Sequence, residues 1–154
     1  MANEKIIRNL ATDFHECSLI KTKRDTMQDD TFAELLHKDT SFQIIAAVYE
    51  VHNVLGFGFL ESVYQKALEK ELRLRGLKAE AQKEIRVRYK DEDVGSYYAD
   101  IVVNDDIILE LKAIENLTKA HEAQLLNYLK GTGLRLGFLI NFGKEKAIYK
   151  RMVL

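Results

Sequence analysis

Apolar residues in the first half of the chain recur at helical spacing. From residue 42 to residue 55 they return every three or four positions, which is typical of a helix packed on one face. The run GFGF at 56–59 interrupts this pattern, and a second periodic stretch covers 60–75 and stops at Gly76. Glycine adopts the left-handed conformation that ends many helices. The pattern therefore predicts two helices separated by a glycine-rich turn.

After Gly76 the apolar period becomes that of a strand. In EIRVRYK, at 84–90, apolar residues alternate with two arginines, which predicts a strand with one solvated face. Two further strands are predicted at 94–103 and 107–113, after turns in the acidic runs DED and NDD. This part of the chain therefore reads as three consecutive strands.

The C-terminal part returns to a helix and then to strands. A helix is predicted at 118–130 and ends in GTG at 131–133. The apolar run 134–142 predicts an interior strand, and 146–152 an edge strand. The order of helices, three strands, a helix, and one or two strands predicts an α/β domain with a mixed β-sheet flanked by helices.

The N-terminal part looks separate from this domain. Apolar residues near helical spacing predict a short amphipathic helix at 2–16, and the mixed charges of 21–30 indicate a solvated linker. We therefore expect an N-terminal extension at 1–40 and one globular domain at 41–154. The whole chain of 154 residues is otherwise the size of a single domain.

Charge and cysteine content exclude several classes of protein. The formal net charge is −1, so the chain lacks the bulk positive field of a nonspecific nucleic-acid binder, and a polyanion would have to meet a local patch. Cys17 is the only cysteine, which excludes an internal disulfide and a cysteine-based zinc cluster and favours a cytoplasmic location. No signal peptide or membrane-spanning run is predicted.

Three charged residues interrupt the apolar strands of ADIVVNDDIILELKA, at 99–113. Glu110 and Lys112 are two positions apart, so they point to one face of their strand. If the loop has three residues, Val103 pairs with Ile107 and Asp100 lies opposite Glu110, with Cβ atoms about 5 Å apart. A two-residue loop would place the two acids on opposite faces.

A pair of close carboxylates needs a cation or a proton. Mg²⁺ takes one or two carboxylates together with waters and phosphate oxygens, and a neighbouring Lys112 would reach a metal-bound water or a phosphate. The alternative is a structural salt bridge between Lys112 and one acid on an exposed face of the sheet.

Four further motifs make a family resemblance. The chain carries GFLESVY at 58–64, Asp100, ELK at 110–112 and QLLNY at 124–128. With these motifs it resembles the GxxExxY protein family of the PD-(D/E)XK nuclease superfamily, from about Phe42 to the C-terminus. The resemblance implies a restriction-endonuclease-like core, in agreement with the predicted order of elements.

The resemblance assigns roles to individual residues. It implies that Asp100 and Glu110 bind Mg²⁺ or Mn²⁺, with Glu61 contributing directly or through water. Lys112 would orient the attacking water or stabilise the phosphate. Gln124 and Tyr128 match a QxxxY motif that contacts the substrate or supports the lysine.

The residues alone leave other interpretations open for the helical motifs. Gln124 and Tyr128 share a stripe with His121, and such a polar stripe is usually the solvent side of a helix. Glu61 would complement the dipole of its helix, and Tyr64 reads as a core residue.

The chain also departs from the family pattern. Phe57 stands where the family usually has proline, which puts the rigidity of that turn in question, and Ala99 precedes Asp100 in place of the proline of the motif. His52 matches a histidine common in the family, but a core histidine with satisfied hydrogen bonds is the expected role.

The sequence therefore leaves three possible functions. The leading hypothesis is a metal-dependent nuclease that hydrolyses phosphodiester bonds, of DNA ahead of RNA, with no membrane partner and with a homodimer allowed. Alternatives are an inactive nuclease-fold module that binds nucleic acid or protein, and a regulatory subunit docked through its N-terminal extension. Basic residues that could contact a nucleic-acid backbone are Lys83, Arg86, Arg88, Lys130 and Arg135.

Overall fold

The computed structural model of the protein describes residues 37–154. The helix and charged linker predicted at 2–16 and 21–30 lie outside the described residues. Residues 39–154 form one compact unit. Its elements are α2 (Lys38–Leu55), α3 (Glu61–Leu74), β1 (Ala79–Tyr89), β2 (Glu92–Val103), β3 (Ile107–Lys112), α4 (Lys119–Thr132), β4 (Leu136–Asn141) and β5 (Ile148–Val153).

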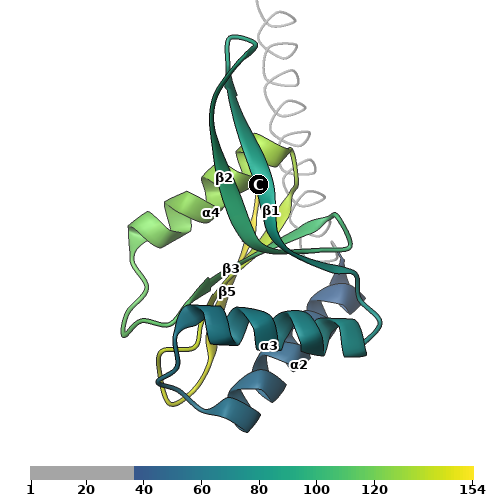
Figure 1. The fold of residues 1–154 in the computed structure, drawn as a ribbon, viewed down its shortest axis with the longest axis vertical. Coiled ribbons are helices and arrows are strands. Elements are labelled where there is room, and N and C mark those ends of the chain that lie inside the picture. Colours follow the sequence, from purple (N-terminus) through teal and green to yellow (C-terminus); the bar gives the residue numbers. More distant parts are fainter. Residues whose placement is uncertain (1–36) are drawn as a thin grey trace, which may run out of the picture. The chain divides into compact units, whose positions relative to one another are not determined.

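The strands form one mixed sheet in chain order, β1-β2-β3-β4-β5 (Figure 1). β3 and β4 are parallel, and the other neighbours are antiparallel. Parallel neighbours cannot be joined by a tight turn, and α4 supplies the crossover between them. The predicted α/β class, a mixed sheet flanked by helices, is confirmed.

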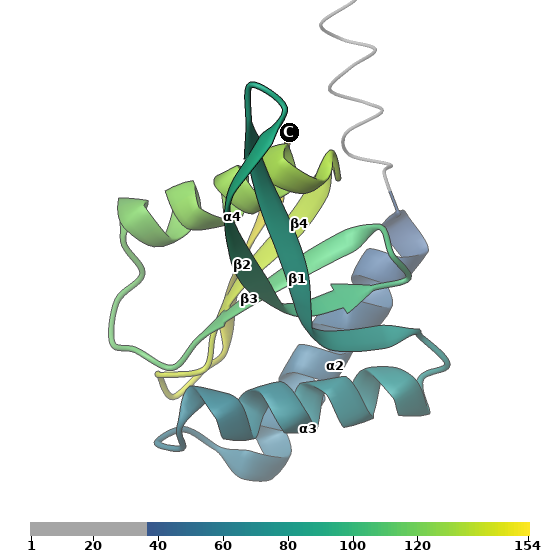
Figure 2. The ribbon, with the colours of Figure 1, turned by 45° about the horizontal axis from the view of Figure 1, so that its top comes forward.

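Helices cover both faces of the sheet. Figure 2 shows α4 on one side and α2 with α3 on the other. On the α4 side, Leu125 and Leu129 belong to one apolar cluster with Ile108 and Leu139. The approach is close, because a Cβ added to Gly137 of β4 would come within 2.8 Å of a Leu125 methyl carbon.

On the other side, aromatic packing connects α3 to the end of β4. The ring of Tyr64 stacks on Phe142 with centroids 4.6 Å apart, and both side chains are fully buried. Tyr64 is therefore a core residue, as the sequence predicted.

Element ends differ from the predicted ones at several places. α2 begins at Lys38 rather than 42, and β1 begins at Ala79 rather than 84 because its first residues pair with the end of β2. α4 continues through Gly131 to Thr132, and Gly133, with φ 73°, ends it. Gly131 stays helical, and a Cβ added to it would lie 3.4 Å from the Ile85 side chain of β1, an ordinary van der Waals contact.

The β1–β2 hairpin extends beyond the rest of the domain as an arm (Figures 1 and 2). Its turn is at Lys90 and Asp91, which have φ of 48° and 68°, rather than at 91–93. Every residue from 88 to 98 is exposed. None of the described helices has the length and apolarity needed to span a bilayer.

Candidate active site

The register of the β2–β3 hairpin places the strand acids. Asn104 and Asp105 have φ of 51° and 60°, and the Asp106 amide donates to the Val103 carbonyl, so the chain reverses in a tight turn. Val103 lies opposite Ile107, as expected for the predicted three-residue loop. The two-residue alternative is wrong. One residue beyond the last pair, Ile101 and Leu109, the same register places Asp100 opposite Glu110.

Asp100 lies where the regular pairing of β2 stops. The β2–β3 ladder ends at Ile101 and Leu109, and beyond it the Leu111 amide donates to Asp100 Oδ2 over 2.7 Å. On the other edge of β2, the register with β1 leaves Gln82 without a paired residue, and Gln82 has a φ of 52°. A side-chain carboxylate thus replaces a ladder hydrogen bond and ties Asp100 to the strand that carries Glu110.

Glu110 and Lys112 form a buried ion pair. Lys112 Nζ donates to Glu110 Oε1 over 2.7 Å, and the two side chains are only 14% and 3% exposed. The salt-bridge interpretation is therefore correct about the pair and wrong about an exposed face. Glu110 Oε2 is buried and has no hydrogen-bond partner among residues 37–154. An unpaired buried carboxylate oxygen is costly.

The acids and the lysine are electrostatically coupled. Burial, followed by the nearby Asp100 carboxylate, raises the pKa of Glu110 to about 7, although Lys112 opposes this. Burial also raises the pKa of Asp100, against the hydrogen bond from Leu111. Burial alone would lower the pKa of Lys112, but the bond to Glu110 and the charges of the acids together raise it.

Glu61 approaches this group from α3. It lies in the first turn of the helix and is half-buried. Burial raises the pKa of Glu61, the charge of Lys112 lowers it, and the charge of Asp100 raises it. The Glu61 carboxyl group is therefore electrostatically coupled to Lys112 and Asp100. The position also suits the helix dipole, so both interpretations of Glu61 agree with its place.

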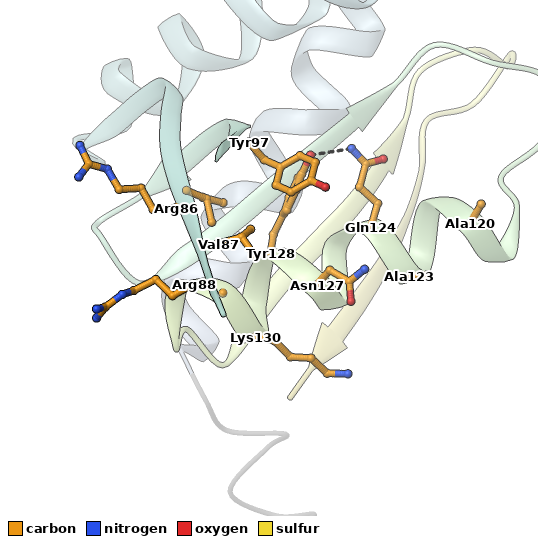
Figure 3. Close-up of a pocket in the computed structure, with 12 residues that line it drawn as sticks. Arg86, Val87, Arg88, Tyr97, Ala120, Ala123, Gln124, Asn127, Tyr128 and Lys130 are labelled. Carbon is orange, nitrogen blue, oxygen red and sulfur yellow. Dashed lines mark hydrogen bonds between the residues drawn. The ribbon is translucent and has the colours of Figure 1, made fainter. Parts of the chain in front are cut away.

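Gln124 and Tyr128 lie on the side of α4 that faces the hairpin. Gln124 Nε2 donates to the Tyr128 hydroxyl over 2.8 Å (Figure 3). Tyr128 is 6% exposed, and Gln124 is half-buried, so the solvent-side interpretation is wrong for these two. Burial raises the pKa of Tyr128, and the charges of Glu110, Lys112 and Asp100 also act on it. His121, on the same stripe, instead caps the helix with Thr118.

A buried amide that the sequence analysis did not single out supports the end of β3. Asn141 is fully buried and lies opposite Lys112 in the parallel ladder. Its Oδ1 accepts from the Ile114 and Gly143 amides at 3.0 Å, and its Nδ2 donates to the Ile114 carbonyl at 2.7 Å. Gly143 is required here, because any Cβ would clash with the Ile114 backbone. An asparagine within the apolar run 134–142 is the signal that could have found it.

The glycine-rich turn before α3 has its own support. The Tyr64 hydroxyl donates to the Gly56 carbonyl over 2.8 Å and accepts from the Phe59 amide at 3.3 Å. These two bonds support the turn in which Phe57 stands where the resemblance leads one to expect proline. His52 packs beside Phe142 and donates from Nε2 to the Lys144 carbonyl, so it is the core histidine that was expected.

The basic candidates differ in their partners. Lys83 pairs with Glu80 and Asp105, while Arg86 and Arg88 both lie near Asp93. Arg135 donates to the Leu154 carbonyl. Lys130 is exposed and has no carboxylate partner within the part of the chain that the structure describes.

Comparison with known proteins adds a family. The model of the PD-(D/E)XK nuclease superfamily matches residues 38–152. This match is to the superfamily, and the narrower resemblance to the GxxExxY family stays a prediction. The search of curated proteins found no match. Among solved structures, the chain is similar to one titled "Crystal structure of SSO0001", with 19% identity and a TM-score of 0.48. The alignment covers 76% of this chain and 59% of that one.

Proposed function

We propose, from the premise that the chain belongs to the PD-(D/E)XK nuclease superfamily, that it is a divalent-metal-dependent nuclease that hydrolyses phosphodiester bonds. The observation that carries the proposal is the buried Oε2 of Glu110, which has no hydrogen-bond partner among residues 37–154 and belongs to a carboxylate coupled to Asp100 and Lys112. A carboxylate oxygen held in this way is stabilised by a cation that binds to it.

The donor chemistry fits Mg²⁺ or Mn²⁺. Among the described residues, no three His, Cys, Asp or Glu side chains are grouped so that they could hold a metal by themselves. Mg²⁺ does not require three, since it keeps several waters and binds through one or two carboxylates and substrate phosphates. Asp100 and Glu110 would provide these carboxylates, and Glu61 would bind through water. The bound ion would lower the pKa of a water and stabilise negative charge on the phosphate.

The remaining residues position the reactants. Lys112 holds a positive charge next to Glu110 and would orient the attacking water or neutralise the charge that develops on the phosphate. The hydrogen bond between Gln124 and Tyr128 fixes a polar pair on the neighbouring helix, where a substrate phosphate or sugar would meet it. DNA is the substrate we expect ahead of RNA.

Calorimetric titration with Mg²⁺ and Mn²⁺ tests the metal site. The wild-type protein should bind, and Asp100→Asn should lose this binding because the carboxylate pair is then broken. Asp105→Asn is the matched control. It is the same substitution in the loop five positions away, at an exposed carboxylate. Equal binding by the Asp100 and Asp105 variants would contradict the proposed ligand.

Cleavage assays test the function itself. The wild-type protein with Mn²⁺ or Mg²⁺ should cleave single- or double-stranded DNA, and Lys112→Met should reduce the rate while metal binding persists. A wild-type protein that binds metal but cleaves neither DNA nor RNA would overturn the nuclease proposal.

The second candidate is a nuclease-fold module that binds nucleic acid or a protein without turnover. The observation that favours it is the Lys112–Glu110 bond, which already occupies one oxygen of the buried carboxylate. The two candidates separate on metal titration, because the binding module needs no divalent ion at Glu110.

A further inference from the structure

A groove lies between the β1–β2 hairpin and α4, next to the candidate active site. Its volume is about 790 Å³, which lies within the range of sites that hold one small ligand, roughly 300–1,000 Å³. Gln124 and Tyr128 form part of its wall, so the groove includes the polar pair described with the candidate active site (Figure 3).

The two walls of the groove differ in chemistry. Figure 3 shows Val87 and Tyr97 of the hairpin directed towards α4, whereas Arg86 and Arg88 point away. Ile85, Val87 and Tyr97 give the hairpin wall an apolar and aromatic surface, while Arg86 and Arg88 also line the groove. The α4 wall combines two small side chains with polar ones, namely Ala120, Ala123, Gln124, Asn127 and Lys130. A ligand that offers a flat apolar face on one side and polar edges and a negative charge on the other would match both walls.

Tyr97 is an exposed aromatic residue of the hairpin wall. Its ring centroid lies 5.6 Å from that of Tyr128, with the planes tilted by 47°. Tyr128 is buried beneath it, but Tyr97 remains 53% exposed. One side of the Tyr97 ring is held by Tyr128, and the rest is open to a ligand. Aromatic rings held in this way serve as stacking platforms for bases, largely regardless of base identity.

Paired and unpaired nucleic acids differ in what they can offer such a ring. Inside a duplex, each base face is covered by its neighbours, so stacking on a protein ring requires a base that is unpaired or taken out of the stack. A single strand exposes base faces and phosphates together. Lys130 and the amide groups of α4 would face the backbone and base edges.

We propose that this groove binds a single-stranded stretch of nucleic acid, with one unpaired base stacked on Tyr97 and an adjacent phosphate directed to Asp100, Glu110 and Lys112. This inference rests on the proposed function and gives it a substrate class. Tyr97 is then a substrate-binding residue, and single strands, flaps or unpaired ends are cleaved in preference to continuous duplex.

The chain offers a matched control in the next residue. Tyr98 is 55% exposed, nearly the same as Tyr97, and lies on the same strand. Tyr97 pairs with Ile85 and Tyr98 with Glu84, so the two side chains project from opposite faces of the hairpin. Tyr98→Ala removes an equally exposed tyrosine that does not line the groove.

The test is binding of the full chain to fluorescent oligothymidylate, to oligouridylate and to a DNA duplex of equal length, in EDTA so that no cleavage occurs. The wild-type protein should prefer the single strands. Tyr97→Ala should weaken single-strand binding by roughly 5- to 100-fold. Tyr98→Ala should leave it unchanged, and Tyr97→Phe should retain it. The two oligonucleotides distinguish a DNA from an RNA strand.

Loss of packing against Tyr128 is separated from loss of stacking by Tyr97→Leu, which keeps an apolar contact but has no aromatic face. If Tyr97→Leu binds as well as wild type, or if Tyr98→Ala weakens binding as much as Tyr97→Ala, the proposal is overturned. Quenching of a 2-aminopurine base in the strand, lost in Tyr97→Leu, would support it.

The outcome for the groove and the outcome for the nuclease remain distinguishable. A protein that binds single strands through Tyr97 but never cleaves them with Mg²⁺ or Mn²⁺ supports the groove and contradicts the nuclease. A protein that cleaves duplex and single strand equally, with no effect of Tyr97→Ala, supports the nuclease and contradicts the groove.

Discussion

Glu110 and Asn141 are buried polar residues on adjacent parallel strands, but they differ in how completely their side chains are hydrogen-bonded. Asn141 is fully buried and uses both side-chain atoms in three hydrogen bonds to the backbone of Ile114 and Gly143. Glu110 is 2% exposed, and its Oε2 has no partner in the described part of the chain. Asn141 is therefore a fully hydrogen-bonded structural residue, whereas one oxygen of the Glu110 carboxylate receives no hydrogen bond from residues 37–154.

The largest expected effect concerns the carboxylate. Glu110→Gln keeps the size of the side chain but removes the charge that would bind a cation. Metal-dependent cleavage should fall by at least about a thousandfold, because metal catalysis contributes several kcal/mol to transition-state stabilisation. Initial rates with Mn²⁺ and Mg²⁺ measure this effect, with Glu115→Gln as an exposed control. Full activity of Glu110→Gln would mean that Glu110 is structural in the same way as Asn141.

The next largest effect concerns the hydrogen bonds of Asn141. Asn141→Leu keeps a similar volume but leaves two amides and one carbonyl near β4 without partners. We expect the free energy of unfolding to fall by about 3 kcal/mol or more, because each unsatisfied buried group costs roughly 1–3 kcal/mol. Urea unfolding measures the change. Asn116→Ala, at an exposed asparagine bonded to Lys144, should change stability by less than about 0.5 kcal/mol.

A smaller effect concerns the raised pKa of Glu110, where a substitution should stabilise the protein instead of destabilising it. The folded-state pKa of Glu110, raised to about 7 from its ordinary 4.5, means that the folded protein binds a proton that the unfolded chain releases between these values. The metal-free wild-type protein should therefore lose stability as pH rises from 4.5 to 7, and Glu110→Gln should not.

We expect Glu110→Gln to be the more stable protein at pH 8 by about 1–2 kcal/mol in EDTA, with the difference absent near pH 4.5. Thermal unfolding at both pH values measures it. Added Mg²⁺ should reverse the order by stabilising the wild type alone. Parallel pH profiles of the two proteins would contradict the raised pKa of Glu110.

The smallest effect is expected at an exposed acid. Asp105 receives hydrogen bonds from Lys78 and Lys83, which lower its pKa to about 2 from 3.8. Because the folded-state pKa is depressed, its contribution to stability is present above about pH 4 and is lost as pH falls towards 2. Asp105→Asn should be slightly less stable than wild type at pH 6 and equal to it near pH 2. Acid unfolding followed by circular dichroism checks this, and a difference that persists at pH 2 would contradict it.

Much of the fold and part of the site could be predicted from the sequence because both follow from local periodicity. Alternation in the strands placed Glu110 and Lys112 on one face, and the three-residue loop set the level of Asp100 against Glu110. Glycines marked the ends of all three helices that cover the sheet. The start of β1 at Ala79 was missed, because its first residues join the strand by pairing with the distant end of β2.

The candidate site shows the same division. The motif residues were identified by their types and spacing, but the Gln124–Tyr128 stripe was ambiguous because a polar helix face is the same in sequence whether water or a hairpin covers it. Asn141 and Tyr64 act by hydrogen bonds to backbone groups at 114 and 56, and no local pattern reveals such bonds.

The sequence alone determined which residue types stand on which face of each strand and helix, because side-chain direction follows the period of the backbone. Only the tertiary structure decided which of these residues are cut off from water. The Glu110 oxygen that lacks a partner within residues 37–154, the raised pKa of its carboxyl group and the exposed ring of Tyr97 all depend on how the strands pack with α3 and α4. Burial and solvation are properties of segments brought together from distant parts of the chain.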